Sequence, residues 1–321
     1  MVNFFLLITA VVINVVTASL LAPVLDGVER RVRARIQCRR GPPVLQTWYD
    51  IIKLLRKGRA SLNQPLVFRL GPYTSLATSL AALTLLPTLL PQSLSFFGDA
   101  ILLIYLLATA SIILAIASAS SGNPLASLGS CRELSLAITS EFCLAVALTA
   151  IFIDRSSLML SKILPPYPPI TPSILIAIGT VGFITYVEGG RLPFDIPEAE
   201  PEISGGVFIE YGGSDLGIAI YSVLIKRLVL ATLLIDLVLP RNVLINYLSK
   251  YLVTYLPYYI LPYVTYAVVA SVYIALLFLI TTSYATIAAL YGRFRLDQAV
   301  PLIKGSVIIA GVAVLAALMG F

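Results

Sequence analysis

The sequence predicts an all-α polytopic membrane protein, with about eight transmembrane helices in a single membrane domain over residues 1–321. Two features of the composition support this prediction: 59% of the 321 residues are hydrophobic and only 12% are charged. A third is the recurrence of apolar runs of about 20 residues, the length of helix that crosses a bilayer. An ordinary soluble domain carries about twice this share of charged residues, so we exclude that class.

The first apolar run, residues 2–22, has no Lys or Arg before Arg30. It therefore lacks the charged start of a cleavable signal peptide, and we expect it to be a retained helix. Several of the later runs are separated by proline or glycine, which end helices. The remaining expected spans are 72–90, 100–119, 134–153, 173–188, 216–239, 259–283 and 301–321.

Between Pro43 and Gly58, apolar residues recur at helical spacing and polar residues fall largely between them. This pattern predicts an amphipathic helix that is too polar to span a membrane and lies at the interface or beneath a partner. The segment 26–71 around it holds the densest cluster of Lys and Arg in the sequence. By the positive-inside rule we place this basic loop in the cytoplasm and both termini outside.

The densest acidic stretch follows the fifth expected span, where six of the 16 acidic residues fall within residues 188–211. Ionised carboxylates next to a bilayer are costly unless they share protons, bind cations or contact water. Closely spaced carboxylates also raise one another's pKa values towards neutrality. We therefore expect a cytoplasmic coupling loop over residues 188–215 whose acids exchange protons, and a merely solvated loop is the alternative.

The fifth span is expected to end at Glu188, because Gly189, Gly190 and Pro193 follow it. Backbone groups freed by such a break need water or polar partners, which fits a hydrated cavity. The simpler interpretation is an i,i+3 ion pair between Glu188 and Arg191 at a helix end.

Charged residues are also expected inside the spans. Glu141 lies about eight residues into the fourth span, with Glu133 two turns before it, and Lys226 lies about ten residues into the sixth span. Asp236 follows near the outer end of the same span. An ionisable residue inside a membrane is by default a functional-site hypothesis. The structural alternatives are a hydrogen-bonded acid next to Arg132 and charge pairs between helices.

The sequence contains no histidine, and its three cysteines, Cys38, Cys131 and Cys143, have no C-x-x-C spacing. Zinc, haem, iron–sulfur clusters and histidine-based catalysis are therefore not expected within this chain, so any redox centre belongs to a partner. The net charge of +6 arises from basic residues beside apolar spans, without a recognition module, which argues against nucleic-acid binding. We expect no catalytic, cofactor-binding or metal-binding residue in this chain.

The acidic stretch carries the pattern E-x-x-R-x-P-F-D-x-x-E-x-E-x-E from Glu188 to Glu202, followed by G-x-x-x-E-Y. It resembles the central cytoplasmic loop of a family that includes subunit 1 of NADH–quinone oxidoreductase, or complex I, and the matching membrane subunit of energy-converting membrane-bound NiFe hydrogenases. The segment before Glu141 resembles the family's S-L-x-G-x-x-R…S-x-E region, and E-R-R at Glu29 followed by R-x-G-P resembles its first loop. The resemblance covers most of the chain.

The resemblance implies a respiratory, non-catalytic coupling subunit that joins an ion-pumping membrane arm to a peripheral redox arm at the cytoplasmic face of the cell (plasma) membrane. The implied partners are peripheral subunits with iron–sulfur clusters, carrying a NiFe site in the hydrogenase branch, and antiporter-like and small membrane subunits that move H⁺ or Na⁺. The sequence D-I-P-E-A-E-P-E-I and the short loops favour a hydrogenase or a related ferredoxin-linked complex. The alternatives are a quinone-site subunit of a complex I-like NADH– or F420H2–quinone oxidoreductase, a stand-alone secondary ion transporter and a passive anchor.

Charge, depth and the resemblance together define two groups of candidate residues. The expected proton or ion coupling path comprises Glu133, Glu141, Glu188, Asp195, Glu198, Glu200, Glu202, Glu210, Lys226 and Asp236. The expected docking surface for the peripheral arm comprises Arg30, Arg31, Arg33, Arg35, Arg39, Arg40 and Arg191. A simple cytoplasmic anchor that obeys the positive-inside rule is the alternative for the basic group.

Overall fold

The computed structural model describes residues 2–58, 64–90, 93–163, 171–252 and 261–320, except for the side chains of residues 2–6, 200, 201, 242 and 252. Every regular element within these ranges is a helix. The long helices are α1 (Val2–Ile36), α3 (Leu66–Leu85), α4 (Asp99–Ala119), α5 (Pro124–Arg155), α7 (Pro172–Glu188), α9 (Gly213–Val238), α11 (Leu261–Leu290) and α12 (Leu296–Met319). The predicted all-α polytopic fold is confirmed.

Each long helix overlaps one of the expected spans. Six of them, α1, α4, α5, α9, α11 and α12, are long and apolar enough to cross a membrane. The helix α7 is apolar but has only 17 residues, and α3 carries Arg69 in its first turn. The chain is a multi-pass membrane protein, and a total of eight crossings stays a prediction.

The helix α1 extends 14 residues beyond the expected end of the first span at residue 22. Arg33 and Arg35 lie in its last turn, where cations interact favourably with the negative end of the helix dipole. Hydropathy alone predicts the end of α1 too early, because the charged arginines lower the hydropathy although arginine is a good helix former. Within the expected basic loop 26–71, the described residues include the end of α1, the short helix α2 (Gln46–Leu55) and the start of α3, so much of this segment is helical.

The helix α5 likewise begins ten residues before the expected start at residue 134. Asn123 caps it, since its side chain accepts a hydrogen bond from the Leu125 backbone N–H. Pro124 occupies the first turn, where the backbone N–H that proline lacks would have no acceptor within the helix. At 32 residues α5 is about 48 Å long, which exceeds the hydrocarbon thickness of a bilayer. Its first ten residues are too polar to be predicted from hydropathy as part of a membrane span.

The short helix α2 confirms the predicted amphipathic element. Ile51 is buried against the bundle, and Thr47 donates a hydrogen bond of 2.8 Å to Asp26 of α1. Tyr49 and Ile52 are exposed on its other side. Four elements were not predicted from the sequence: the helix α10 (Arg241–Leu252) and the short elements α6 (Leu160–Ile163), α8 (Glu200–Ile203) and η1 (Gly206–Phe208).

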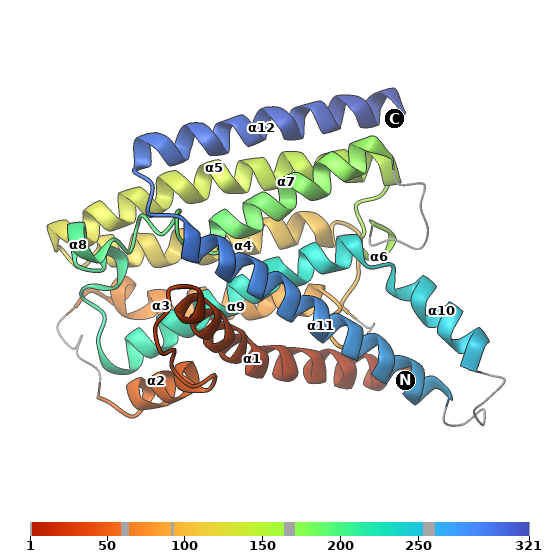
Figure 1. Ribbon diagram of the computed structural model, residues 1–321, viewed down its shortest axis with the longest axis horizontal. Helices are drawn as coiled ribbons and strands as arrows, with labels where there is room; N and C mark the ends of the chain where they lie inside the picture. Colours follow the sequence, from red (N-terminus) through yellow and green to blue (C-terminus); the bar gives the residue numbers. More distant parts are fainter. Residues whose placement is uncertain (1, 59–63, 91–92, 164–170, 253–260, 321) are drawn as a thin grey trace.

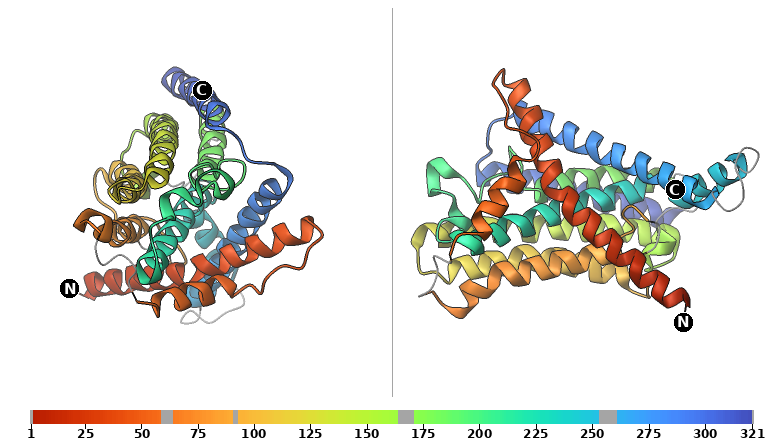
Figure 2. Two further views of the ribbon diagram at one scale, coloured as in Figure 1. Left: turned by 90° about the vertical axis from the view of Figure 1, so that its left-hand side faces the viewer. Right: turned by 90° about the horizontal axis from the view of Figure 1, so that it is seen from below.

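The chain crosses the bundle repeatedly, and helices that follow one another in sequence are not always neighbours. The helix α12 packs on α5 and α7, whereas α11 packs on α1 and α9 (Figure 1). The helix α7 packs on both α5 and α9, and the core includes fully buried side chains from all three: Leu144, Ile184, Ile225, Leu230 and Leu233. Both termini lie at one end of the bundle, and α2 and α8 lie at the other (Figures 1 and 2). The basic segment and the acidic loop therefore share one end of the molecule.

Candidate functional site

Three charged side chains from different helices meet inside the bundle. Lys226 of α9 places its Nζ atom 3.0 Å from Glu188 Oε2 and 3.7 Å from Glu141 Oε1. Glu188 is the last residue of α7 and Glu141 lies in the second half of α5. The Glu188 side chain is 1% exposed and those of Glu141 and Lys226 are each 8% exposed. Three residues that the sequence singled out separately thus form one buried cluster, which we call the central cluster.

A serine completes the surroundings of the lysine. The Lys226 ammonium donates a hydrogen bond of 2.6 Å to Ser111 Oγ, and both residues are buried. Ser111 belongs to α4, so the ammonium is contacted from α4, α5 and α7. Among the described residues, neither oxygen of Glu141 or Glu188 has a hydrogen-bond partner, although one oxygen of each is ion-paired to Lys226. The cluster therefore retains hydrogen-bonding capacity that protons or water can use.

A small cavity joins the central cluster to the acidic loop. Its volume is about 60 Å³, which is space for about four water molecules. Glu188, Lys226 and Ser111 line it, and so do Glu133 of α5 and two acids of the loop, Asp195 and Glu198. The sequence expectation of a hydrated break after α7 therefore has a structural counterpart, because polar side chains from both the membrane interior and the loop face one space.

The two loop acids that line the cavity have perturbed ionisation. Burial raises the pKa of Glu198 to about 7, and the nearby charge of Asp195 raises it further than Arg227 lowers it. Burial also raises the pKa of Asp195, although Arg293 donates a hydrogen bond of 2.9 Å to it. A carboxyl group with a pKa near 7 binds and releases protons readily at neutral pH.

The outer acids of the loop lie apart from the cavity. Glu202 is exposed, and Arg132 of α5 donates a hydrogen bond of 2.6 Å to it, which lowers the pKa of Glu202. Glu210 accepts a hydrogen bond of 2.6 Å from the side chain of Asn123, the cap of α5. The coupling-path assignment of Glu200 concerns a side chain outside the described part of the chain. These contacts attach the loop to one end of α5.

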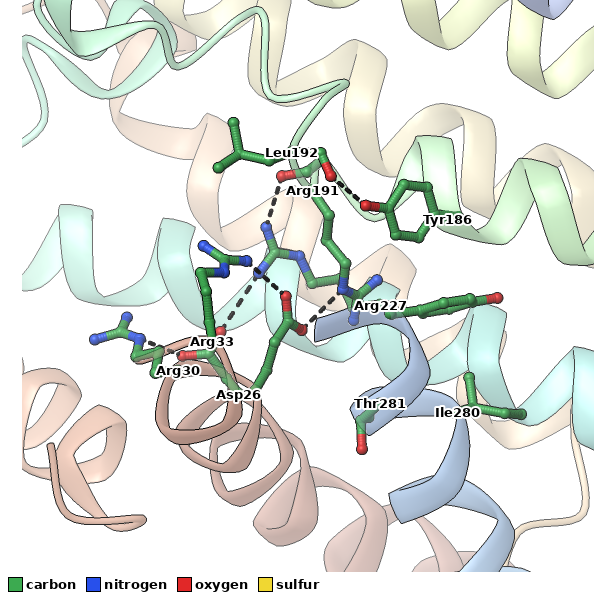
Figure 3. A network of polar contacts seen from close by, with 12 residues as sticks. Asp26, Arg30, Arg33, Tyr186, Arg191, Leu192, Arg227, Ile280 and Thr281 are labelled. Carbon is green, nitrogen blue, oxygen red and sulfur yellow. Dashed lines mark hydrogen bonds and ion pairs between the residues drawn. The ribbon is translucent and has the colours of Figure 1, made fainter. Parts of the chain in front are cut away.

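A second charged cluster lies where the end of α1 meets α9 and the residues that follow α7, and we call it the arginine–carboxylate network (Figure 3). Its members are Asp26, Glu29, Arg30, Arg33, Arg191 and Arg227. Glu29 of α1 is buried and accepts from Arg191 at 2.8 Å and from Arg33 at 2.9 Å. One carboxylate thus joins the acidic-loop arginine to the end of α1.

Asp26 forms the second centre of this network. It lies 2.8 Å from Arg30 and 3.5 Å from Arg227 of α9. Arg227 also donates a hydrogen bond of 3.3 Å to the backbone carbonyl of Gly190, two residues after Glu188. Arg227 follows Lys226 directly in α9, so the central cluster and the network are connected through adjacent residues.

Several expectations about single residues need correction. The i,i+3 ion pair between Glu188 and Arg191 is wrong, because Glu188 pairs with Lys226 and Arg191 with Glu29. Arg191 is also only 6% exposed, which contradicts its assignment to an exposed docking surface. Of the other predicted docking residues, Arg30, Arg31, Arg35, Arg39 and Arg40 are exposed, while Arg33 is half-buried.

Asp236 is not part of the central cluster. Near the far end of α9 it forms an ion pair with Arg241, the first residue of α10. The Arg241 guanidinium lies 4.3 Å from the ring centroid of Tyr273 and donates a hydrogen bond to the carbonyl of Thr88. These contacts favour the structural charge pair over the relay as the role of Asp236, and they tie α9, α10 and α11 together at that end.

Sequence reasoning missed Ser111, Asp26 and Glu29. The two acids precede Arg30 and Arg33 by four residues in α1, so helical i,i+4 pairing could have identified them. No sequence signal distinguished Ser111 from the other hydroxyl residues of α4. Within the described ranges, no three His, Cys, Asp or Glu side chains are grouped so that they could hold a metal ion.

The chain is similar to membrane subunits of several respiratory complexes. The sequence profile described as NADH dehydrogenase matches residues 8–319. Formate hydrogenlyase subunit 4 of Escherichia coli (strain K12) is 37% identical over 227 residues, which are 68% of this chain and 73% of that protein. Hydrogenase-4 component C of the same organism is 34% identical over 69% of this chain and 72% of that protein. An NADH-quinone oxidoreductase subunit of Rickettsia canadensis (strain McKiel) is 31% identical over 68% of each chain.

A solved structure shares the fold. A chain of the membrane-bound sulfane sulfur reductase (MBS), an archaeal respiratory membrane complex, superimposes with a TM-score of 0.84. The match covers 97% of this chain and 99% of that chain at 24% sequence identity, so it carries information on the fold alone. The profile match over nearly the whole length and the identity to the curated relatives show that this chain belongs to the NADH dehydrogenase family of membrane subunits.

Proposed function

We propose that the chain is a non-catalytic coupling subunit of a respiratory, redox-driven complex that translocates H⁺ or Na⁺. In this proposal it joins a peripheral electron-transfer arm to ion-pumping membrane subunits. The peripheral arm carries iron–sulfur clusters and, in the hydrogenase branch, a NiFe site, and this chain binds none of these groups. Its relatives are subunits of hydrogenase, formate hydrogenlyase and NADH–quinone oxidoreductase complexes, which supports the general class.

The observation that carries the proposal is the central cluster. Two carboxyl groups and one ammonium lie in the apolar interior, where charged groups cost free energy even when they are paired. A passive anchor has no use for Glu141, Glu188 and Lys226 at one point between three helices. A proton that enters or leaves this cluster changes its net charge by one, and the effect on neighbouring charges is large in a medium of low dielectric constant.

The cavity supplies the connection between this cluster and the redox arm. Glu198 and Asp195 of the acidic loop line the same space as Glu188 and Lys226. Electron transfer next to the loop would change the charge on these acids, and Glu198 responds near neutral pH because its pKa is about 7. Protons then redistribute towards Glu141, and the altered field acts on ion-translocating subunits beside this chain.

The arrangement of charge supports an orientation. The exposed arginines at the end of α1 lie at the same end as the acidic loop, away from both termini (Figure 1). By the positive-inside rule this end faces the cytoplasm, so both termini lie outside in the plasma membrane. Arg30, Arg31, Arg35, Arg39 and Arg40 then form an exposed docking surface for the peripheral arm.

A hydrogenase or a related ferredoxin-linked complex is the branch that we favour. The identities to the formate hydrogenlyase and hydrogenase-4 subunits, 37% and 34%, are higher than the 31% to the NADH–quinone oxidoreductase subunit. A quinone-site subunit of a complex I-like oxidoreductase is the second candidate. Gentle purification of the native complex, followed by metal analysis and a hydrogen-evolution assay with reduced ferredoxin, separates them. Nickel with hydrogen evolution supports the first, and iron without nickel supports the second.

The same purification tests the wider class. A coupling subunit should be purified together with soluble redox subunits, whereas a stand-alone secondary transporter should be purified alone. Isolation of the chain as a single species, with ion-exchange activity and no associated metal, would exclude the proposed function.

The residue-level test is Glu141→Gln in the native complex. We expect it to abolish ion uptake into inverted vesicles, measured with a pH-sensitive dye and with radioactive Na⁺, while electron transfer in the peripheral arm persists. Asp297→Asn is the matched control, because Asp297 is 66% exposed and lies next to Arg295 outside the cluster. Uptake at the wild-type rate in Glu141→Gln would remove Glu141 from the path.

A further inference from the structure

Ser111 is the nearest described partner of the Lys226 ammonium. The Nζ–Oγ distance is 2.6 Å, compared with 3.0 Å to Glu188 and 3.7 Å to Glu141. Of the three described partners of the ammonium, Ser111, Glu188 and Glu141, the serine alone is uncharged. It comes from α4, which contributes none of the charged residues to the cluster.

The hydroxyl of Ser111 also differs from other hydroxyls of α4 in its hydrogen bonding. The hydroxyls of Thr109 and of Ser120, the C-cap residue of α4, each donate to a helix carbonyl three residues earlier, as helical Ser and Thr often do. Among the described residues, Ser111 Oγ makes only the contact with Lys226, in which it is the acceptor. Since a hydroxyl has one donor and two acceptor sites, its own proton remains available to the cavity that Ser111 lines.

The position of this acceptor constrains the lysine. An ammonium on a four-carbon chain has many rotamers, and attraction to two carboxylates alone would let it settle against either one. A third acceptor on a different helix limits where Nζ can lie. With Ser111 in place, Nζ is 3.0 Å from the Glu188 carboxylate and 3.7 Å from the Glu141 carboxylate, so the ammonium interacts with both acids.

We propose that Ser111 is a positioning residue that holds the Lys226 ammonium between Glu188 and Glu141. It thereby fixes how the positive charge is shared between the two acids. This inference rests on the proposed function of the central cluster, because its consequence is measured as ion coupling. It assigns no covalent step to the serine.

The test uses the intact complex with Ser111→Ala, Ser111→Thr and the control Ser120→Ala. Ion uptake per electron transferred is measured in inverted vesicles from pH 5.5 to 8.5, with reduced ferredoxin or reduced methyl viologen as the electron donor. We expect Ser111→Ala to lower this ratio about ten-fold and to shift its pH profile, because losing one hydrogen bond to a charged group changes an equilibrium on that scale. Ser111→Thr retains the hydroxyl and should restore the ratio, and Ser120→Ala should match the wild type.

Assembly of each complex is checked by co-purification of its subunits. If Ser111→Ala does not assemble, Ser111→Cys replaces it, since a thiol of similar size is only a weak acceptor, and the same loss of coupling is expected. A wild-type ratio and pH profile in the assembled variant would overturn the role of Ser111. If Glu141→Gln is impaired in the same assay, the proposed function survives that result. If Glu141→Gln is also normal, both the inference and the proposed function fail.

Discussion

Replacing Glu198 with glutamine should stabilise the folded protein, and by more at high pH than at low pH. The pKa of Glu198 rises from an ordinary value of 4.5 to about 7, chiefly because the carboxyl is buried. Each pKa unit corresponds to about 1.4 kcal/mol, so ionising this group costs about 3 kcal/mol more in the folded protein than in the unfolded chain. Glutamine has nearly the same shape and carries no charge to bury.

The sign of the pH dependence follows from the two pKa values. Below pH 4.5 the carboxyl is protonated in both states, so it causes no penalty and the variant and the wild type should be equally stable. The penalty grows as the pH rises from 4.5 to about 7 and is complete above that. The advantage of Glu198→Gln should therefore increase across this window and reach about 3 kcal/mol at pH 8.

The assay is unfolding of the purified complex in detergent, followed at pH 5, 6, 7 and 8 by intrinsic tryptophan and tyrosine fluorescence. Asp297→Asn is the control for removing a surface carboxylate, and its effect should be small at each pH. The coupled ion uptake of Glu198→Gln should at the same time fall, because a glutamine cannot accept a proton from the loop. A stability difference that is constant or shrinks as pH rises would refute the reasoning that burial controls the ionisation of Glu198.

Two further predictions concern stability. Gly129→Ala should destabilise the protein by about 1–3 kcal/mol and loosen the acidic loop, because the added Cβ atom would lie 2.7 Å from Gly206 Cα. A thermal melt measures the loss of stability, and limited proteolysis measures the loosening of the loop. Its control, Gly179→Ala in α7, has no heavy atom within 4 Å of the added Cβ and should be stabilising by about 0.5–1 kcal/mol. Arg241→Leu should cost about 3–5 kcal/mol in a thermal melt, since it leaves buried Asp236 without its cation, and Asp236→Asn in the same chain should recover part of the loss. Equal melting temperatures of Arg241→Leu and the wild type would show that the pair contributes nothing.

The helical architecture could be predicted from the sequence because apolar runs of spanning length reflect the bilayer directly. The predicted ends of α4 and α7 were accurate, and at α7 Gly189 and Gly190 follow the last turn. The predicted ends failed where a helix continues as polar sequence, as in α1 and at the start of α5. Hydropathy reports where a helix meets lipid, whereas the end of a helix depends on capping and on contacts with other helices.

The charged residues of the site could be identified individually but their pairing could not. Depth and the cost of buried charge singled out Glu141 and Lys226, and the expected helix break singled out Glu188; all three side chains are buried in the bundle. Their meeting depends on which helices are neighbours, and that is set by packing over the whole bundle. The sequence suggested Arg191 as the partner of Glu188 because the two are close in the chain. In the structure, Arg191 instead forms its ion pair with Glu29 of α1.

Lys226 and Arg227 are adjacent in α9, and successive residues of a helix point about 100° apart. One side chain reaches the central cluster and the other reaches Asp26 and the Gly190 carbonyl, so ionic contacts on two sides fix the rotation of α9 about its axis. Turning the helix to improve either contact would weaken the other. The helix therefore holds a fixed orientation between the central cluster and the arginine–carboxylate network, and we expect a change of protonation in one to act on the other through its electric field, without rotation of α9.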